Sequence, residues 1–158
     1  MSDQPTIALI GPGAIGTTIA ALLYEVDRTP LLCGRTAHPQ LILRHDDGEV
    51  VVPGPVLSNP STISHPFDLV FVAVKTTQVA DSDDWLAALC DENTVVCALQ
   101  NGVEQKSQLE PYVNGAKVLP SVVWFPAQRE PDASVRLRAK PRLTLPDVPQ
   151  AQQVVDAL

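Results

Sequence analysis

The sequence of 158 residues has few aromatic side chains and few positive charges. Its 11 Lys and Arg residues against 18 Asp and Glu leave a formal net charge of −7. Proteins that bind nucleic acids cluster Lys and Arg against the phosphate backbone, so this balance argues against a nucleic-acid partner. Any phosphate group bound by this chain must be recognised by a local feature, such as a helix N-terminus or a single well-placed arginine.

Cysteine is also scarce. Cys33, Cys90 and Cys97 show neither the CxxC spacing nor the His partners of a metal or redox site, and the three histidines are equally scattered. We therefore expect no bound metal. We interpret the cysteines as buried apolar side chains of a protein from a reducing compartment.

Long hydrophobic runs are absent as well. The longest, residues 69–74, is far too short to span a bilayer, and the start MSDQPTIALIGPG lacks the basic region of a signal peptide. These observations predict a cytoplasmic protein without a membrane partner. The length suits a single domain over residues 1–158, and an apolar fraction of 45% suffices for a core.

What the sequence does contain is an alternation of strand and helix patterns. A β-rich run over residues 6–10 is followed by apolar residues at helical spacing, and then by a short strand over residues 31–33. The helical face consists of Ile15, Ile19, Leu22, Leu23 and Val26. Further strands are predicted at residues 69–74, 94–98 and 117–124, and further helices at residues 79–90, 103–113 and 150–158. This alternation predicts an α/β fold with a doubly wound, mostly parallel sheet.

Two hairpins are expected beside that sheet. Residues 41–44 and 50–52 flank a turn at Asp46-Asp47-Gly48, and residues 135–139 and 142–145 flank Lys140-Pro141. They would add antiparallel strands, whereas residues 53–66 are predicted as a loop. The last helix has no stop signal, and we expect the chain to end at a domain edge.

A glycine-rich loop joins the first predicted strand to the first predicted helix. It fits the pattern G-x-G-x-x-G and consists of Gly11, Pro12, Gly13, Ala14, Ile15 and Gly16. The first glycine of such a loop permits a tight turn, the second admits a pyrophosphate, and the third lets the helix pack against the strand. The position of the pattern predicts a dinucleotide-binding Rossmann fold. The alternative is a glycine-rich connection without a ligand.

The residue after the second strand distinguishes the possible cofactors. NAD sites usually place an acidic side chain there for the ribose hydroxyls, but this chain has Arg35. A guanidinium can pair with a 2′-phosphate through a planar fork of donors. We therefore predict NADP(H) as the cofactor, the alternative being that Arg35 is a solvated surface residue.

Two more polar residues follow predicted strands. Lys75 comes directly after residues 69–74, and Asn101 follows residues 94–98. Ligands of doubly wound sheets collect at the carboxyl ends of the strands, so both side chains are expected on the rim that carries the glycine loop. Lys75 could bind a carboxylate or steer charge, and Asn101 could hydrogen-bond ribose or carboxamide. Each could instead be an ordinary surface residue.

These motifs together resemble a known family. GPGAIG, CGR, VAVKTTQ and LQNG, in this order and spacing, are similar to the N-terminal domain of ketopantoate reductases (2-dehydropantoate 2-reductases). The resemblance implies reduction of 2-dehydropantoate to pantoate with NADPH, a step toward pantothenate and coenzyme A. It also implies that residues 11–16 bind the pyrophosphate and Arg35 the 2′-phosphate. Lys75, Gln78 and Asn101 would then contact the cofactor or support catalysis.

The resemblance also implies a part that this chain lacks. The family has a helical C-terminal domain that supplies the general acid and most substrate contacts, and the surface that it covers could otherwise pair two copies as a homodimer. Residues 121–126 are bulkier than the family's equivalent, which leaves another 2-keto acid open as the substrate. Two further alternatives are a non-catalytic NADP-binding regulatory module and a related hydroxyacid or 6-phosphogluconate-like dehydrogenase.

Overall fold

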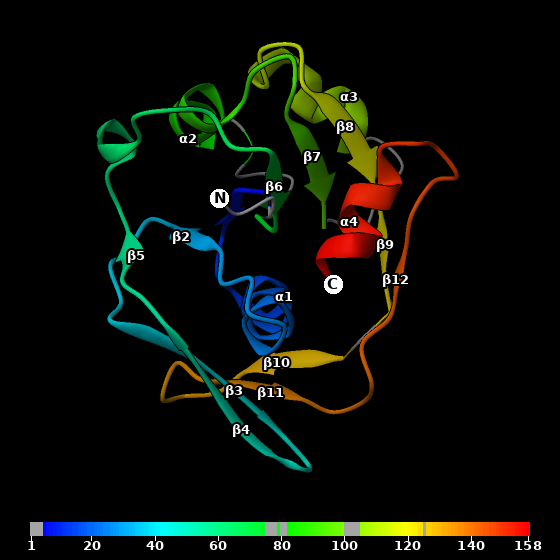
Figure 1. The fold of residues 1–158 in the computed structure, drawn as a ribbon. Helices are drawn as coiled ribbons and strands as arrows, with labels where there is room; N and C mark the ends of the chain where they lie inside the picture. Colours follow the sequence, from blue (N-terminus) through cyan, green and yellow to red (C-terminus); the bar gives the residue numbers. More distant parts are fainter. Residues whose placement is uncertain (1–4, 75–78, 80–81, 100–104, 125) are drawn as a thin grey trace.

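A computed structural model of the chain describes residues 5–74, 79, 82–99, 105–124 and 126–158. Its central sheet has six strands in the order β5-β2-β1-β6-β7-β8, and all neighbouring strands are parallel (Figure 1). These strands are β1 (Ile7–Ile10), β2 (Leu31–Cys33), β5 (Val56–Leu57), β6 (Leu69–Val72), β7 (Val95–Ala98) and β8 (Lys117–Pro120). The chain adds strands outward from β1 on one side and from β6 on the other. The doubly wound parallel sheet is thus confirmed, with its switch point between β1 and β6.

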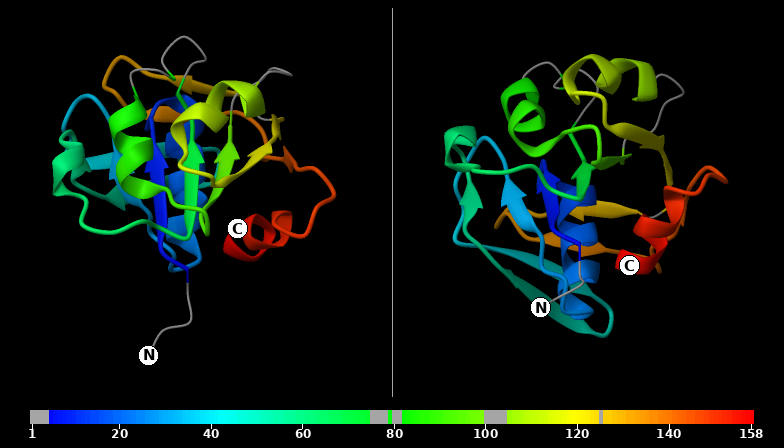
Figure 2. Two further views of the ribbon diagram at one scale, coloured as in Figure 1. Left: turned by 90° about the horizontal axis from the view of Figure 1, so that it is seen from above. Right: turned by 45° about the horizontal axis from the view of Figure 1, so that its top comes forward.

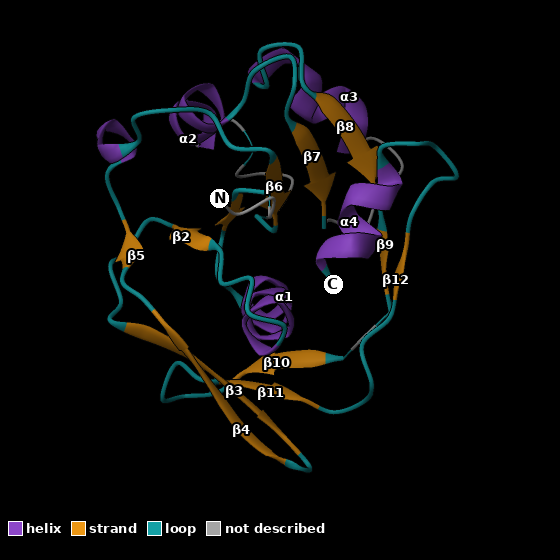
Figure 3. Cartoon of the chain, in the orientation of Figure 1, coloured by secondary structure: helices purple, strands orange, loops and turns teal. Residues whose placement is uncertain are grey.

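Helices cover both faces of this sheet (Figure 3). They are α1 (Ala14–Glu25), α2 (Asp83–Leu89), α3 (Gln105–Leu109) and α4 (Ala151–Ala157), with 3₁₀ turns at Pro60–Thr62 and Glu110–Tyr112. Alternate strand residues enter two cores: Leu9 and Phe71 pack in the core of α1 and α4, whereas Ile10 and Val70 pack in the core of α2. Burial on both faces explains the unbroken apolar runs of these strands.

The predicted helices after β6 and β7 are longer than the observed ones. The helix predicted over residues 79–90 begins at Asp83, and Asp83 and Asp84 place two carboxylates in its first turn, where the helix dipole favours them. The helix predicted over residues 103–113 passes from α3 into a 3₁₀ turn at Pro111. Proline has no N–H to donate, so it does not continue an α-helix.

Helix α1 is more buried than its predicted single face implies. Residues 17–21 are all buried, whereas Val26 lies beyond the end of the helix and is 45% exposed. The reason is a second sheet on the side of α1 away from the central sheet (Figure 2, right). With a sheet on either side, α1 has almost no solvated stripe along these residues.

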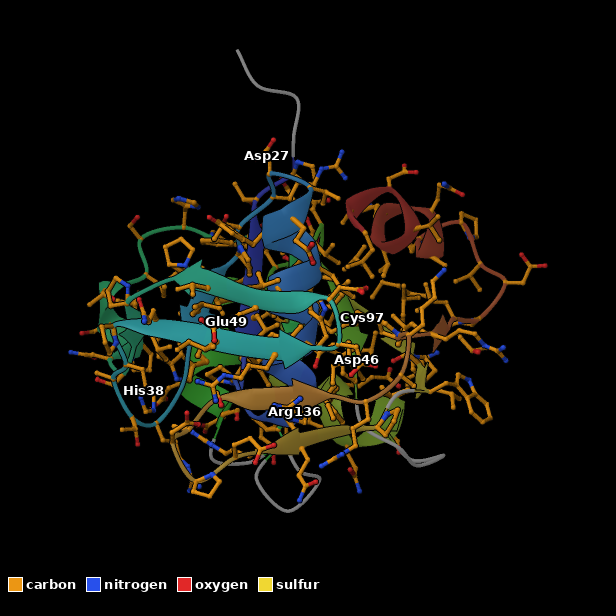
Figure 4. All side chains as sticks on the ribbon, turned by 90° about the horizontal axis from the view of Figure 1, so that it is seen from below. Asp27, His38, Asp46, Glu49, Cys97 and Arg136 are labelled. Atoms are coloured by element: carbon orange, nitrogen blue, oxygen red, sulfur yellow. The ribbon has the colours of Figure 1, made fainter. Side chains whose placement is uncertain are left out.

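This second sheet has the strand order β10-β11-β3-β4 (Figure 4). Its strands are β3 (Gln40–His45), β4 (Gly48–Pro53), β10 (Ala127–Arg129) and β11 (Val135–Leu137). The predicted first hairpin is confirmed, because β3 and β4 pair antiparallel across Asp46-Asp47. Strand β11 adds to β3 in the parallel sense, and β10 adds antiparallel to β11.

The predicted second hairpin is wrong. Strand β11 does not pair with β12 (Leu143–Thr144), which instead pairs antiparallel with β9 (Val122–Val123). Val135 and Leu137 of β11 are buried beside β3, whereas β12 lies against a different strand. Burial of these apolar side chains in separate places outweighs the local turn signal. The strand predicted over residues 117–124 is in fact two strands, β8 and β9. The loop predicted over residues 53–66 contains the short strand β5.

The three cysteines are buried free thiols, as predicted. Burial raises the pKa of Cys33, Cys90 and Cys97 to about 12. At neutral pH these thiols are protonated and poorly nucleophilic. Among the residues that the structure describes, no helix has the length and hydrophobicity needed to cross a bilayer.

Candidate functional site

The glycine loop between β1 and α1 has a shape that requires glycine at two positions. Gly11 has a positive φ of 88°, and a Cβ added there would lie 2.8 Å from Cγ1 of Val74. A Cβ at Gly16 would overlap the carbonyl oxygen of Gly11. The first and third glycines therefore let the chain turn sharply and let α1 pack directly on that turn.

Gly13, the second glycine, faces open space. No described atom lies within 4 Å of a Cβ built at this position. Gly13 is also the N-cap of α1, whose first turn has no acidic residue. The amide groups of a first helical turn lack acceptors within the helix and carry the positive end of the helix dipole. This loop is therefore suited to an anion that approaches the backbone.

Backbone hydrogen bonds connect the loop to its neighbouring strands. The Gly11 N–H donates to the Cys33 carbonyl oxygen at 2.9 Å, and the Ala73 N–H donates to the Ile10 carbonyl oxygen at 2.9 Å. The Thr17 hydroxyl donates to the Pro12 carbonyl oxygen at 3.1 Å. The ends of β1, β2 and β6 are thus held together where the strand order reverses.

A pocket of about 510 Å³ opens at this switch point. Its described lining residues are Ile10, Gly11, Pro12, Gly13, Ala14, Ile15, Gly34, Arg35, Thr36, His38, Ala73, Val74, Ser82, Trp85 and Arg129. The volume lies in the range of small-molecule sites. Ligands of doubly wound sheets bind at this place because the crossovers on either side of the switch point leave a crevice.

The polar side chains of this pocket are biased toward positive charge. Arg35 follows β2, and Arg129 ends β10; both are exposed, and no Asp or Glu occurs among the described lining residues. The chain as a whole has a net charge of −7, so the bias belongs to this pocket and not to the general composition. An anionic ligand is therefore favoured here.

Sequence reasoning missed several residues of the pocket. His38, considered from the sequence only as a metal ligand, is half-buried and lines the pocket near the start of β3 (Figure 4). Ser82 lines it at the N-cap of α2, Trp85 lines it from α2, and Arg129 lines it from β10. The helical pattern around Trp85 was visible in the sequence, but nothing local relates Arg129 to a loop more than a hundred residues earlier.

Three predicted site residues, Lys75, Gln78 and Asn101, lie outside the described residues. Their proposed roles remain predictions. Within the part of the chain that the structure describes, no three His, Cys, Asp or Glu side chains gather where a metal ion could be held.

The family model described as Ketopantoate reductase PanE/ApbA matches residues 7–150. The chain belongs to this family. The resemblance carried by the motifs is thereby confirmed, and the match covers β1, the glycine loop, Arg35 and the second sheet.

Individual relatives agree with the family model. The chain is 46% identical over 153 residues to a 2-dehydropantoate 2-reductase of Mycobacterium tuberculosis, which covers 96% of this chain and 52% of that protein. It is 34% identical over 125 residues to a 2-dehydropantoate 2-reductase of Caulobacter vibrioides, covering 78% of this chain and 43% of that protein. The chain thus spans about half the length of the curated relatives that it matches.

Solved structures show the same architecture. A dimeric ketopantoate reductase from Staphylococcus aureus matches with a TM-score of 0.78 at 28% identity, over 96% of this chain and 55% of that one. A PanE/ApbA family ketopantoate reductase from Ralstonia eutropha matches with a TM-score of 0.83 at 23% identity, over 96% and 52% of the two chains. The second match supports the fold alone.

Proposed function

We propose that this chain is the NADPH-binding domain of a 2-dehydropantoate 2-reductase, which reduces 2-dehydropantoate to pantoate. The observation that carries the proposal is the pocket at the β1/β6 switch point, where the glycine loop and Arg35 lie together. Membership of the ketopantoate reductase family and 46% identity to a protein of that name support the reaction.

The described residues fit a dinucleotide. The open space at Gly13 and the start of α1 would receive the pyrophosphate, and Thr36 and His38 continue the pocket beyond Arg35 toward the second sheet. When bound, NADPH would supply the hydride for the ketone carbon, whereas the chain's own residues bind and orient it. Lys75, Gln78 and Asn101 are proposed to contact the cofactor or the substrate from the same rim.

The guanidinium of Arg35 favours NADPH over NADH. NAD sites use a carboxylate after the second strand to accept hydrogen bonds from the ribose hydroxyls. Here Arg35 can donate two hydrogen bonds to a 2′-phosphate, and no described acidic side chain lines the pocket to repel that group.

The remaining half of the relatives' length is proposed to supply a helical C-terminal domain with the general acid and the substrate contacts. The substrate would then bind between the two domains, and closure would exclude water. The proposal includes a cytoplasmic location and a homodimer. Its alternative substrate is another 2-keto acid. A dimer is described for the relative from Staphylococcus aureus.

The experiment that tests the proposal is a calorimetric titration of the protein, and of Arg35→Gln, with NADPH and separately with NADH. The unaltered protein should bind NADPH at least about tenfold more tightly than NADH, a difference of about 1.4 kcal/mol. Arg35→Gln should lose most of that preference, since hydrogen bonds to a charged group contribute about 1.5–3 kcal/mol each.

Arg138→Gln is the matched control, because Arg138 is an exposed residue next to β11 that does not line the pocket. It should bind both cofactors as the unaltered protein does. Equal binding of NADPH and NADH by the unaltered protein would contradict the proposed cofactor. Assays of the full-length enzyme with 2-dehydropantoate and with smaller 2-keto acids then compare kcat/KM between substrates.

A further inference from the structure

The pocket contains a second guanidinium besides that of Arg35, and it comes from neither the glycine loop nor the segment after β2. Arg129 is the last residue of β10, an edge strand of the second sheet, yet it lines the same pocket as Arg35. Two arginines, one in the segment after β2 and one at the end of β10, therefore line one pocket.

The pairing of the second sheet explains how Arg129 reaches this place. Arg129 lies opposite Val135 of β11, and Val135 lies beside Leu43 of β3. Strand β3 follows directly on the segment that contains Arg35 and His38. The end of β10 thus lies level with the middle of β3, and the pocket lining relates Arg129 to the residues that follow β2.

The backbone near Arg129 is held firmly. The turn between β10 and β11 is closed by the Glu130 N–H, which donates to the Ser134 carbonyl oxygen at 2.8 Å. Arg44 of β3 stabilises the same turn, because its Nη1 donates to Asp132 Oδ2 at 2.8 Å and to Ser134 Oγ at 2.9 Å. A side chain anchored on such a turn loses less conformational freedom when it binds a ligand than one on a loose loop.

The arginines within β3 and β11 of this sheet are paired with acidic side chains, and Arg129 is not. Arg44 pairs with Glu49 and Asp132, and Arg136 pairs with Glu130. With the residues that the structure describes, Arg129 forms neither an ion pair nor a side-chain hydrogen bond, and its side chain is exposed. Its charge is available to an anion in the pocket.

We propose that Arg129 binds the 2′-phosphate of NADPH together with Arg35 and so determines the preference for the phosphorylated cofactor. This inference rests on the proposed function. A phosphomonoester carries up to two negative charges and three terminal oxygens near neutral pH, so one guanidinium leaves part of its charge and hydrogen-bonding capacity unmet. The pyrophosphate is a separate anion, received by the glycine loop at the start of α1. The phosphomonoester is thus the anion that remains for the arginines.

The test measures dissociation constants of the full-length protein and of Arg129→Gln for NADPH, NADH and adenosine 2′-monophosphate. The last probe carries the phosphomonoester without the pyrophosphate. Arg129→Gln should weaken NADPH and adenosine 2′-monophosphate about tenfold and change NADH less than twofold. Arg129→Lys should recover part of the loss, because a lysine keeps the charge without the planar fork.

The control Arg138→Gln removes one positive charge near the same sheet outside the pocket and should leave all three constants unchanged. Unchanged NADPH binding by Arg129→Gln would overturn the inference, as would equal weakening of NADPH and NADH. If Arg35→Gln loses the preference and Arg129→Gln keeps it, this inference fails and the proposed function stands. If the unaltered protein binds NADPH and NADH equally, the proposed cofactor fails and the inference fails with it.

Discussion

At the scale of single residues, Gly13 and Gly16 stand three positions apart in one motif and serve different purposes. Gly16 is buried, and a side chain there would overlap the Gly11 carbonyl oxygen. Gly13 faces open space, where a side chain meets no described atom. One glycine is therefore required by packing, and the other is required only if a ligand approaches.

This difference predicts opposite effects of two alanine substitutions. Gly16→Ala should lower the free energy of unfolding by about 1–3 kcal/mol, because the added methyl group overpacks the turn. Gly13→Ala should leave stability nearly unchanged but weaken NADPH binding about tenfold or more, since its methyl group occupies the ligand's approach. Urea denaturation and calorimetry measure the two effects. A Gly13→Ala protein with unaltered NADPH affinity would show that the pyrophosphate lies elsewhere.

Asp132 provides a prediction about pH. Hydrogen bonds from Ser134, followed by those from Arg44, lower the pKa of this carboxyl to about 2. A carboxyl whose pKa is lower in the folded state stabilises the fold above its unfolded pKa of about 3.9, and this contribution is lost as pH falls toward 2. Asp132→Asn should therefore be less stable than the unaltered protein at pH 7, and the difference should narrow at pH 3.

Urea denaturation at the two pH values measures that difference. Asp147→Asn changes an exposed carboxyl outside the turn and should match the unaltered protein at pH 7. A difference for Asp132→Asn that stays constant down to pH 3 would show that the turn does not depend on the charge of this carboxylate.

At the scale of elements, α1 is constrained by packing on two sides. It lies between the central sheet and the second sheet, and Ala20 and Ala21 are fully buried there. Small side chains let both sheets approach the helix closely. The helix is thus positioned from both sides, and the glycine loop at its N-terminus is positioned with it.

Ala20→Leu should lower the free energy of unfolding by about 1–3 kcal/mol, because the larger side chain has no space between the sheets. Glu25→Leu introduces the same side chain at an exposed position of α1 and should change stability by less than about 0.5 kcal/mol. Thermal or urea denaturation compares the two. Equal stability of both variants would mean that the second sheet does not pack tightly on α1.

At the scale of the whole molecule, the three thiols report on global unfolding. Cys33 lies on β2, Cys90 follows α2 and Cys97 lies on β7, all buried. Because burial raises each pKa to about 12, the reactive thiolate is scarce in the folded protein. Alkylation in native buffer should add no mass within minutes, whereas in denaturant it should add three adducts. Rapid labelling of one thiol in native buffer would reveal local opening.

The sequence supports a large part of the site but not all of it. The glycine loop and Arg35 could be placed because each follows directly on a strand with a clear apolar run. Arg129 could not be placed in the site from the sequence, since Ala127–Arg129 is a three-residue edge strand without apolar alternation. His38 could not either, because its burial depends on neighbours that are far away in the sequence.

The sequence by itself determined the parallel strands, the glycine turn and the family. These follow from backbone sterics, side-chain periodicity and motif spacing, which act over a few residues. The tertiary structure alone decided that β11 joins β3 in parallel, that β12 pairs with β9 and that Arg129 faces the pocket of Arg35. Those outcomes depend on which apolar surfaces are buried against each other across long stretches of chain, and no local signal encodes that choice.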